Sequence, residues 1–89
     1  MKPGKLLERL ATGKLRNVAF ADLCRLAEAL GFRLGRVRGS HHVYTHQELP
    51  VRLNLQDRHG EAKPYQIRQL LAVVEDYNLT LARQGIRKQ

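Results

Sequence analysis

Apolar residues recur at helical spacing along the first third of the chain. A short pattern over residues 5–11 predicts a first helix that stops before Gly13. A longer pattern has Asn17 before it as a candidate N-cap and Gly31 after it, where glycine commonly ends a helix. It predicts a second helix, because five apolar residues fall on one helix face: Phe20, Leu23, Cys24, Ala27 and Leu30.

The spacing of apolar residues then changes to about two, which is the period of a β-strand. Three such runs predict three short antiparallel strands: residues 32–37, 43–44 and 51–55. Gly39-Ser40 is a turn between the first two strands. Leu34 and Val37 are an odd number of residues apart, so a regular strand cannot direct both toward one face. We therefore expect a β-bulge at Gly35.

A last helix begins at Pro64, because proline lacks the N–H that would stay unsatisfied at the first helical position. The stripe of apolar residues that follows is typical of a helix packed on one side: Ile67, Leu70, Leu71, Val74 and Tyr77. The basic tail at 80–89 has few apolar residues to bury, so we expect it to fray.

The order of elements predicts an α+β fold. Three antiparallel strands can bury one face under the two flanking helices and leave the other face in water, with the short N-terminal helix as an addition. With 89 residues the chain has room for one domain, which excludes a multidomain enzyme. We divide this single domain, 1–89, into an N-terminal addition at 1–16, a core at 17–79 and the tail.

Charge narrows the classes of partner. The chain has 16 Lys and Arg against 8 Asp and Glu, which gives a net charge of +8 and favours a polyanion as ligand. No apolar run is long enough for a membrane helix or a secretory signal, so we expect a cytoplasmic protein without a membrane partner. The single cysteine, Cys24, cannot form an intramolecular disulfide and is interpreted as a small core residue.

Polar chemistry is densest between residues 36 and 46. This segment holds three of the four histidines, two arginines, hydroxyl groups and no carboxylate, a composition that favours RNA over a neutral ligand. A histidine with an ordinary pKa of about 6.5 can take up a proton and return it, which suits RNA cleavage by attack of its own 2′-hydroxyl. His41 is our candidate for proton transfer, with Arg36 or Arg38 stabilising the charge on phosphorus. The alternative is that these histidines are ordinary solvated strand residues.

A metal centre is not expected from this pattern. On an extended strand His42 and His46 would lie about 13 Å apart, from four steps of roughly 3.3 Å, whereas zinc ligands converge on one point. His41 and His42 would point to opposite faces of the sheet. We therefore predict metal-independent chemistry without a cofactor.

Several further residues are candidates for RNA binding or electrostatic support. If Val43 is buried, Tyr44 faces water and can stack on a base; if Tyr44 is buried, stacking is impossible. Lys63 adds charge at a helix start that is able to hold phosphate, although an ordinary helix start is the alternative. The full set of candidates is Arg36, Arg38, Ser40, His42, Tyr44, His46 and Lys63.

The run Arg-x-x-Gly-Ser-His-His-Val-Tyr-Thr-His at 36–46, after a helix ending in Gly31-Phe32, resembles the HicA-type toxins of bacterial toxin-antitoxin systems. The resemblance spans residues 20–79. It implies a double-stranded-RNA-binding-like α-β-β-β-α domain and a metal-independent endoribonuclease that cleaves messenger RNA. It also implies inhibition by a cognate HicB-type antitoxin. The functional histidine of the family follows the Gly-Ser pair, which makes His41 the general acid or base.

Two features depart from the family pattern. Residues 1–16 are an addition that minimal members lack, and residues 54–56 read Asn-Leu-Gln where many members have Pro-x-His. The second departure leaves the partner of His41 unassigned; Asp57 and His59 are candidates, with a solvated turn as the alternative. A non-catalytic RNA-binding module on the same fold, and a helix-turn-helix DNA binder built on the first two helices, are competing hypotheses.

Overall fold

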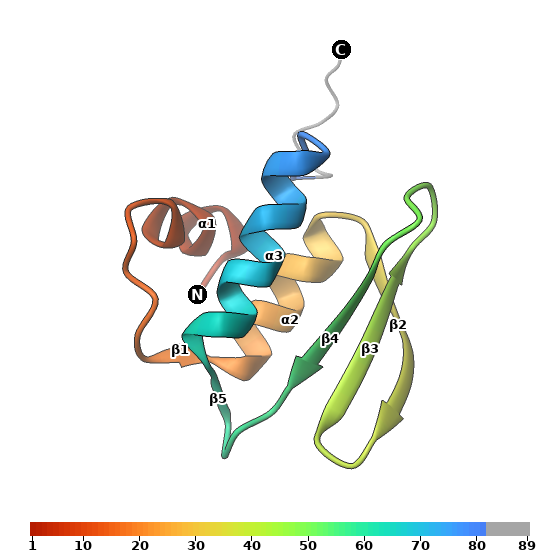
Figure 1. Ribbon diagram of the computed structural model, residues 1–89. Helices are drawn as coiled ribbons and strands as arrows, with labels where there is room; N and C mark the ends of the chain where they lie inside the picture. Colours follow the sequence, from red (N-terminus) through yellow and green to blue (C-terminus); the bar gives the residue numbers. More distant parts are fainter. Residues whose placement is uncertain (82–89) are drawn as a thin grey trace.

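The computed structural model describes residues 1–81, so most of the predicted tail at 80–89 lies outside the described residues. The order of elements confirms the predicted α+β fold, with an N-terminal helix, a second helix, a three-stranded antiparallel sheet and a last helix (Figure 1). The helices are α1 (Pro3–Ala11), α2 (Phe20–Ala29) and α3 (Pro64–Asp76). The strands are β1 (Val18–Ala19), β2 (Phe32–Arg38), β3 (His41–His46), β4 (Arg52–Gln56) and β5 (Glu61–Ala62).

The main sheet has the strand order β2-β3-β4, and all its pairs are antiparallel. The predicted turn at Gly39-Ser40 is confirmed, since Arg38 pairs with His41 across a two-residue loop and Gly39 has a φ of 59°. The predicted bulge at Gly35 is also confirmed, because the register shifts between Leu34 and Arg36.

The sequence pattern did not reveal β1 and β5. They form a separate two-stranded antiparallel ladder in which Val18 pairs with Ala62. Strands of two residues are too short to show a period. Because β1 lies between α1 and α2 and pairs with β5, the first two helices are not joined by the simple turn that a helix-turn-helix DNA binder needs.

The core lies between the sheet and the helices, with α2 and α3 on one face of the sheet (Figure 1). Leu6 and Leu10 of α1 belong to the same core, so the N-terminal addition packs on the domain. The largest fully buried side chains include six residues of the predicted apolar patterns, together with Val18 and Leu26, which those patterns did not include; the six are Leu6, Leu10, Leu23, Leu55, Ile67 and Leu70.

The ends of the helices differ in how well the sequence predicted them. Pro64 begins α3 as expected. Asn17 as N-cap of α2 is wrong: the cap position is Ala19, and Asn17 adopts a φ of 58° in the preceding turn, a conformation that asparagine tolerates better than most residues. Gly31 has a φ of 103°, and a Cβ there would lie 2.6 Å from His46 Nε2. In the part of the chain that the structure describes, no helix is long and apolar enough to cross a membrane.

Candidate active site

The face of the sheet that points away from the helices, here called the open face, is built by alternate residues of β2, β3 and β4. In β3 the residues on the open face are His41, Val43 and Thr45, because Tyr44 between them is buried on the helix side. Cross-strand pairing sets basic or amide side chains on both sides of these three residues. The flanking residues are Arg33, Arg36 and Arg38 on β2, and Arg52, Asn54 and Gln56 on β4.

His41 lies at the start of β3 and its side chain is exposed. Its Nδ1 atom lies 3.0 Å from Oδ1 of Asn54 on the adjacent strand. An amide oxygen accepts hydrogen bonds and cannot donate them, so Nδ1 of the neutral ring carries the proton and Nε2 carries the lone pair. Asn54 therefore holds His41 in the tautomer whose free nitrogen can accept a proton.

Asn54 was missed as the partner of His41 by the sequence analysis, which considered Asp57 and His59. The Asp57 carboxylate instead accepts a hydrogen bond from the Gly60 N–H at 2.6 Å and stabilises the turn after β4. His59 is exposed in that turn with a φ of 57°. Both residues fit the alternative interpretation of a solvated turn.

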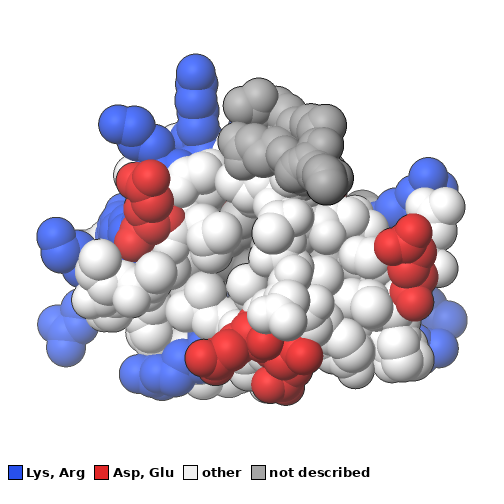
Figure 2. Space-filling view, turned by 90° about the horizontal axis from the view of Figure 1, so that it is seen from above, with Lys and Arg blue, Asp and Glu red and all other residues white. Residues whose placement is uncertain are grey.

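Arg36 and Arg38 both lie on the open face, opposite Val43 and His41. Neither makes an ion pair among residues 1–81; the three ion pairs there join Asp22 to the terminal amine of Met1 and to Arg25, and Glu61 to Lys63. Their guanidinium groups are thus available to an external anion. Seen from above, Lys and Arg side chains project at both ends of the molecule, so the basic surface also includes the end formed by α1 (Figure 2).

Stacking of a base on Tyr44 is wrong, because only 2% of this residue is exposed. Burial, followed by hydrogen bonding with the Cys24 thiol, raises the pKa of Tyr44 above its ordinary range. Burial likewise raises the pKa of the Cys24 thiol, and the nearby charge of Glu28 adds to that shift. Val43, and not Tyr44, takes the position on the open face.

His42 and His46 were predicted to be candidates for RNA binding. Both point to the helix side of the sheet, because they alternate along β3 with the residues of the open face. His42 packs edge-on against Phe20 with ring centroids 4.8 Å apart, and His46 packs against Phe32 at 4.9 Å. His46 also accepts the Glu48 N–H at Nδ1, 3.1 Å, while Nε2 lies 3.3 Å from the Leu30 carbonyl oxygen. His46 thus joins the loop after β3 to the end of α2, and neither ring contributes to the open face.

Hydrogen bonds tie the β2–β3 turn to the start of α3. Gln56 donates from Nε2 to Ser40 Oγ at 3.3 Å and accepts at Oε1 from the Tyr65 hydroxyl at 3.5 Å. The backbone N–H of Gln56 donates to Oε1 of the buried Gln66 at 2.8 Å. Ser40 therefore connects the turn before His41 to Gln56 at the end of β4. Direct contact of Ser40 with RNA stays a prediction.

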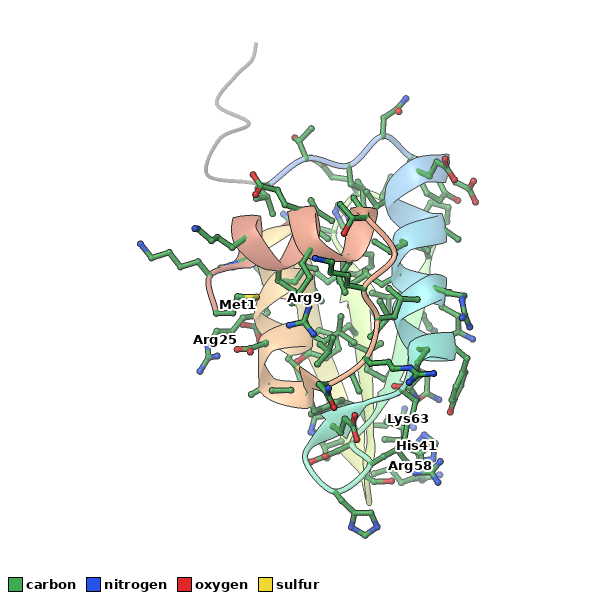
Figure 3. All side chains as sticks on the ribbon, turned by 90° about the vertical axis from the view of Figure 1, so that its left-hand side faces the viewer. Met1, Arg9, Arg25, His41, Arg58 and Lys63 are labelled. Atoms are coloured by element: carbon green, nitrogen blue, oxygen red, sulfur yellow. The ribbon has the colours of Figure 1, made fainter. Side chains whose placement is uncertain are left out.

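Lys63 precedes α3 and its ammonium group lies 3.5 Å from the Glu61 carboxylate. The side chains of His41, Arg58 and Lys63 gather at the same end of the molecule, where β3 begins, β4 ends and α3 starts (Figure 3). This end therefore combines a histidine, free guanidinium groups and a helix N-terminus. Among residues 1–81, no group of three or more histidine, cysteine or acidic side chains is placed to hold a metal ion.

The fold and this surface define a small basic α+β domain whose sheet exposes one histidine among arginines. Residues 20–75, more than half of the chain, match the family model described as "HicA toxin of bacterial toxin-antitoxin". The chain belongs to the HicA toxin family, as its resemblance to that family predicts. Neither a search of curated proteins nor a search of solved structures gave a match.

Proposed function

We propose that this protein is a cytoplasmic toxin that cleaves messenger RNA without a metal ion, and that a HicB-type antitoxin inhibits it. The family supports this proposal, because HicA toxins are messenger-RNA interferases and a toxin of this kind has an antitoxin as partner. The observation that carries it is the exposed His41, whose Nδ1 lies 3.0 Å from Asn54 Oδ1 and whose partner on β2 is Arg38.

The reaction begins when His41 Nε2 accepts the proton of a ribose 2′-hydroxyl. The 2′-oxygen attacks the adjacent phosphorus, and the bond from phosphorus to the 5′-oxygen breaks as a 2′,3′-cyclic phosphate forms. The departing 5′-oxygen takes a proton from water, so the products are a cyclic phosphate end and a 5′-hydroxyl end. The protonated imidazole then returns its proton to solvent.

The neighbouring arginines lower the barrier by electrostatic stabilisation. Negative charge increases on the phosphoryl oxygens when the pentacoordinate transition state forms, and Arg38, the strand partner of His41 on β2, supplies a positive charge to stabilise it. Arg36 and the remaining arginines of the open face, Arg33 and Arg52, bind phosphates on either side of the scissile bond. Single-stranded RNA suits this face, because its backbone can follow the row of guanidinium groups.

The direct test compares wild-type protein with His41→Ala in bacteria, following growth and messenger-RNA integrity together. We expect His41→Ala to lower the cleavage rate by about 10²–10⁴-fold, the usual contribution of one proton-transfer group, while the exposed position leaves folding intact. His59→Asn is the matched control, because it removes an exposed histidine from a turn and keeps a residue that tolerates positive φ. Cleavage by His41→Ala at the wild-type rate would remove the proposed role.

A purified assay separates catalysis from mere binding. An RNA oligonucleotide with a single 2′-deoxy substitution at the cleavage position lacks the attacking hydroxyl, so we expect it to bind and remain intact. The second candidate, a non-catalytic RNA-binding module, is favoured by the arginines of the open face, which bind phosphate whatever His41 does. It predicts salt-sensitive binding and no cleavage of either oligonucleotide.

A further inference from the structure

We infer that the outer edge of β2 is the docking site for an acidic β-strand of the antitoxin, an inference that rests on the proposed function. β2 pairs only with β3, so the backbone N–H and C=O groups on its other side have no strand partner within residues 1–81. Of the seven residues of β2, only Phe32 is buried. An unpaired strand edge is a template on which a strand of another chain can add to the sheet.

Two apolar residues of this edge are uncovered. Leu34 is 46% exposed and Val37 is 51% exposed. The bulge at Gly35 brings both to the helix side, where Leu34 is paired with the buried Tyr44 and Val37 with His42. β2 lies at the edge of the sheet on the side away from β4 (Figure 1). Exposed apolar side chains along an open strand edge favour contact with a protein.

The other side of the same edge is strongly basic. Arg33, Arg36 and Arg38 are exposed on the open face, and no carboxylate occurs between residues 33 and 46. A strand that alternates acidic and apolar residues therefore complements β2 on both faces, with carboxylates beside the arginines and apolar side chains beside Leu34 and Val37. Because the bulge interrupts the edge, the added ladder runs along residues 36–38, the half nearest His41.

A second copy of this protein and RNA are the two other candidates for this edge, and both fit it less well than an acidic strand. Antiparallel pairing of two copies through β2 would bring arginines against arginines, and like charges across a ladder destabilise it. RNA would bind the guanidinium groups, but it gains nothing from Leu34 or Val37 and forms no backbone ladder. An acidic antitoxin strand matches the unpaired backbone edge, the exposed apolar side chains and the arginines. It also neutralises Arg36 and Arg38 beside His41, and this inhibits cleavage without a contact to the imidazole.

The test uses the double variant Leu34→Gln/Val37→Gln, which removes the apolar surface and leaves every arginine and His41 in place. Because both residues are exposed, we expect the variant to fold and to cleave RNA at the wild-type rate. We expect its affinity for the purified cognate antitoxin, measured by calorimetry, to fall about tenfold or more. Tyr77→Gln, an exposed aromatic residue at the end of α3, is the matched control and should bind the antitoxin normally.

Amide hydrogen exchange identifies the occupant. Addition of the antitoxin should slow exchange of amides in residues 36–38 of the wild type and slow it less in Leu34→Gln/Val37→Gln, whereas an uncleavable RNA oligonucleotide, which binds the guanidinium groups, should bind both proteins equally. Wild-type affinity in the double variant, or no antitoxin binding by the wild type, would overturn the inference. Weaker RNA binding by the double variant, or protection of these amides when the concentration of the protein alone is raised, would overturn it in favour of those occupants. Failure of the wild type to cleave RNA counts against the proposed function and leaves the antitoxin measurement interpretable.

Discussion

The Nδ1 atom of His41 lies 3.0 Å from Oδ1 of Asn54, across the pairing of β3 with β4. The amide fixes the ring orientation and leaves Nε2 as the acceptor, which is the arrangement a general base requires. A carboxylate in the same place would also orient the ring, but it would add a negative charge that favours the protonated imidazole. The neutral amide orients the ring without adding a negative charge to a face that carries four arginines.

This relationship predicts different effects for two substitutions of Asn54. Asn54→Leu removes the acceptor, so the cleavage rate should fall, by less than the roughly 10²–10⁴-fold expected when the imidazole itself is removed. Asn54→Asp keeps an acceptor and adds a charge that favours the imidazolium ion, so the acid limb of the pH–rate profile should move to higher pH. Profiles of both variants that superimpose on that of the wild type would show that Asn54 does not act on His41.

Arg36 and Arg38 are predicted to set the salt dependence of RNA binding. Each phosphate contact with a single strand contributes about 0.7 to the slope of log affinity against log salt concentration, so Arg36→Gln/Arg38→Gln should reduce the slope by about 1.4. The measurement is fluorescence anisotropy with labelled RNA, in the His41→Ala background to prevent cleavage.

Lys14→Gln provides the control for this measurement. Lys14 is an exposed cation in the loop after α1, which lies away from the open face. Its replacement removes one positive charge, against two in the double variant, and should leave the slope close to that of the wild type. A reduction of about 0.7 per charge removed in both variants would indicate that RNA responds to the net charge of the protein and does not bind the open face.

The sequence was sufficient wherever one residue type dictates local geometry. Pro64 located the start of α3, and the odd spacing of Leu34 and Val37 located the bulge at Gly35. The sequence was not sufficient to predict which of two neighbouring residues is buried when both are apolar. Val43 and Tyr44 are both apolar enough to bury, so a period of two could not decide which one faces the helices.

The choice between Val43 and Tyr44 also determines on which face of the sheet two histidines lie. Once Tyr44 is inside, His42 and His46 follow it, and their rings pack on Phe20 and Phe32. Asn54 escaped notice for a different reason: its contact with His41 depends on the register between β3 and β4, which only the assembled sheet determines. The local sequence pattern therefore predicted the helices and the three strands of the main sheet. Which side chains lie together at the site depends on the packing and register of the assembled sheet.

Gln66 is predicted to stabilise the junction between β4 and α3. It is 3% exposed, and its Oε1 accepts the Gln56 N–H at 2.8 Å. Gln66→Leu leaves this part-buried donor without a partner, which should lower the free energy of unfolding by about 1–3 kcal/mol in urea denaturation. Gln69→Leu, an exposed position one turn along the helix, should change stability far less. Equal effects of the two substitutions would mean that the hydrogen bond is not the cause.

Tyr44 is predicted to make the stability of the protein depend on alkaline pH. Its pKa is raised in the folded state by burial and by the hydrogen bond to Cys24, whereas an unfolded chain ionises tyrosine near pH 10. Above that value unfolding releases a proton, so the stabilisation is fully present below about pH 10 and is lost as pH rises toward the folded-state value. The limiting slope for one proton is about 1.4 kcal/mol per pH unit.

The variant Tyr44→Phe isolates this contribution when unfolding is followed by urea denaturation between pH 8 and pH 11. It keeps the buried ring and loses the hydrogen bond to Cys24, so it should be about 0.5–1.5 kcal/mol less stable than the wild type at pH 8. Above pH 10 its stability should fall less steeply, because the ionising group is absent. Tyr77→Phe should keep the wild-type slope, since Tyr77 is 40% exposed at the end of α3. The same alkaline slope in Tyr44→Phe as in the wild type would show that the buried hydroxyl is not the linked group.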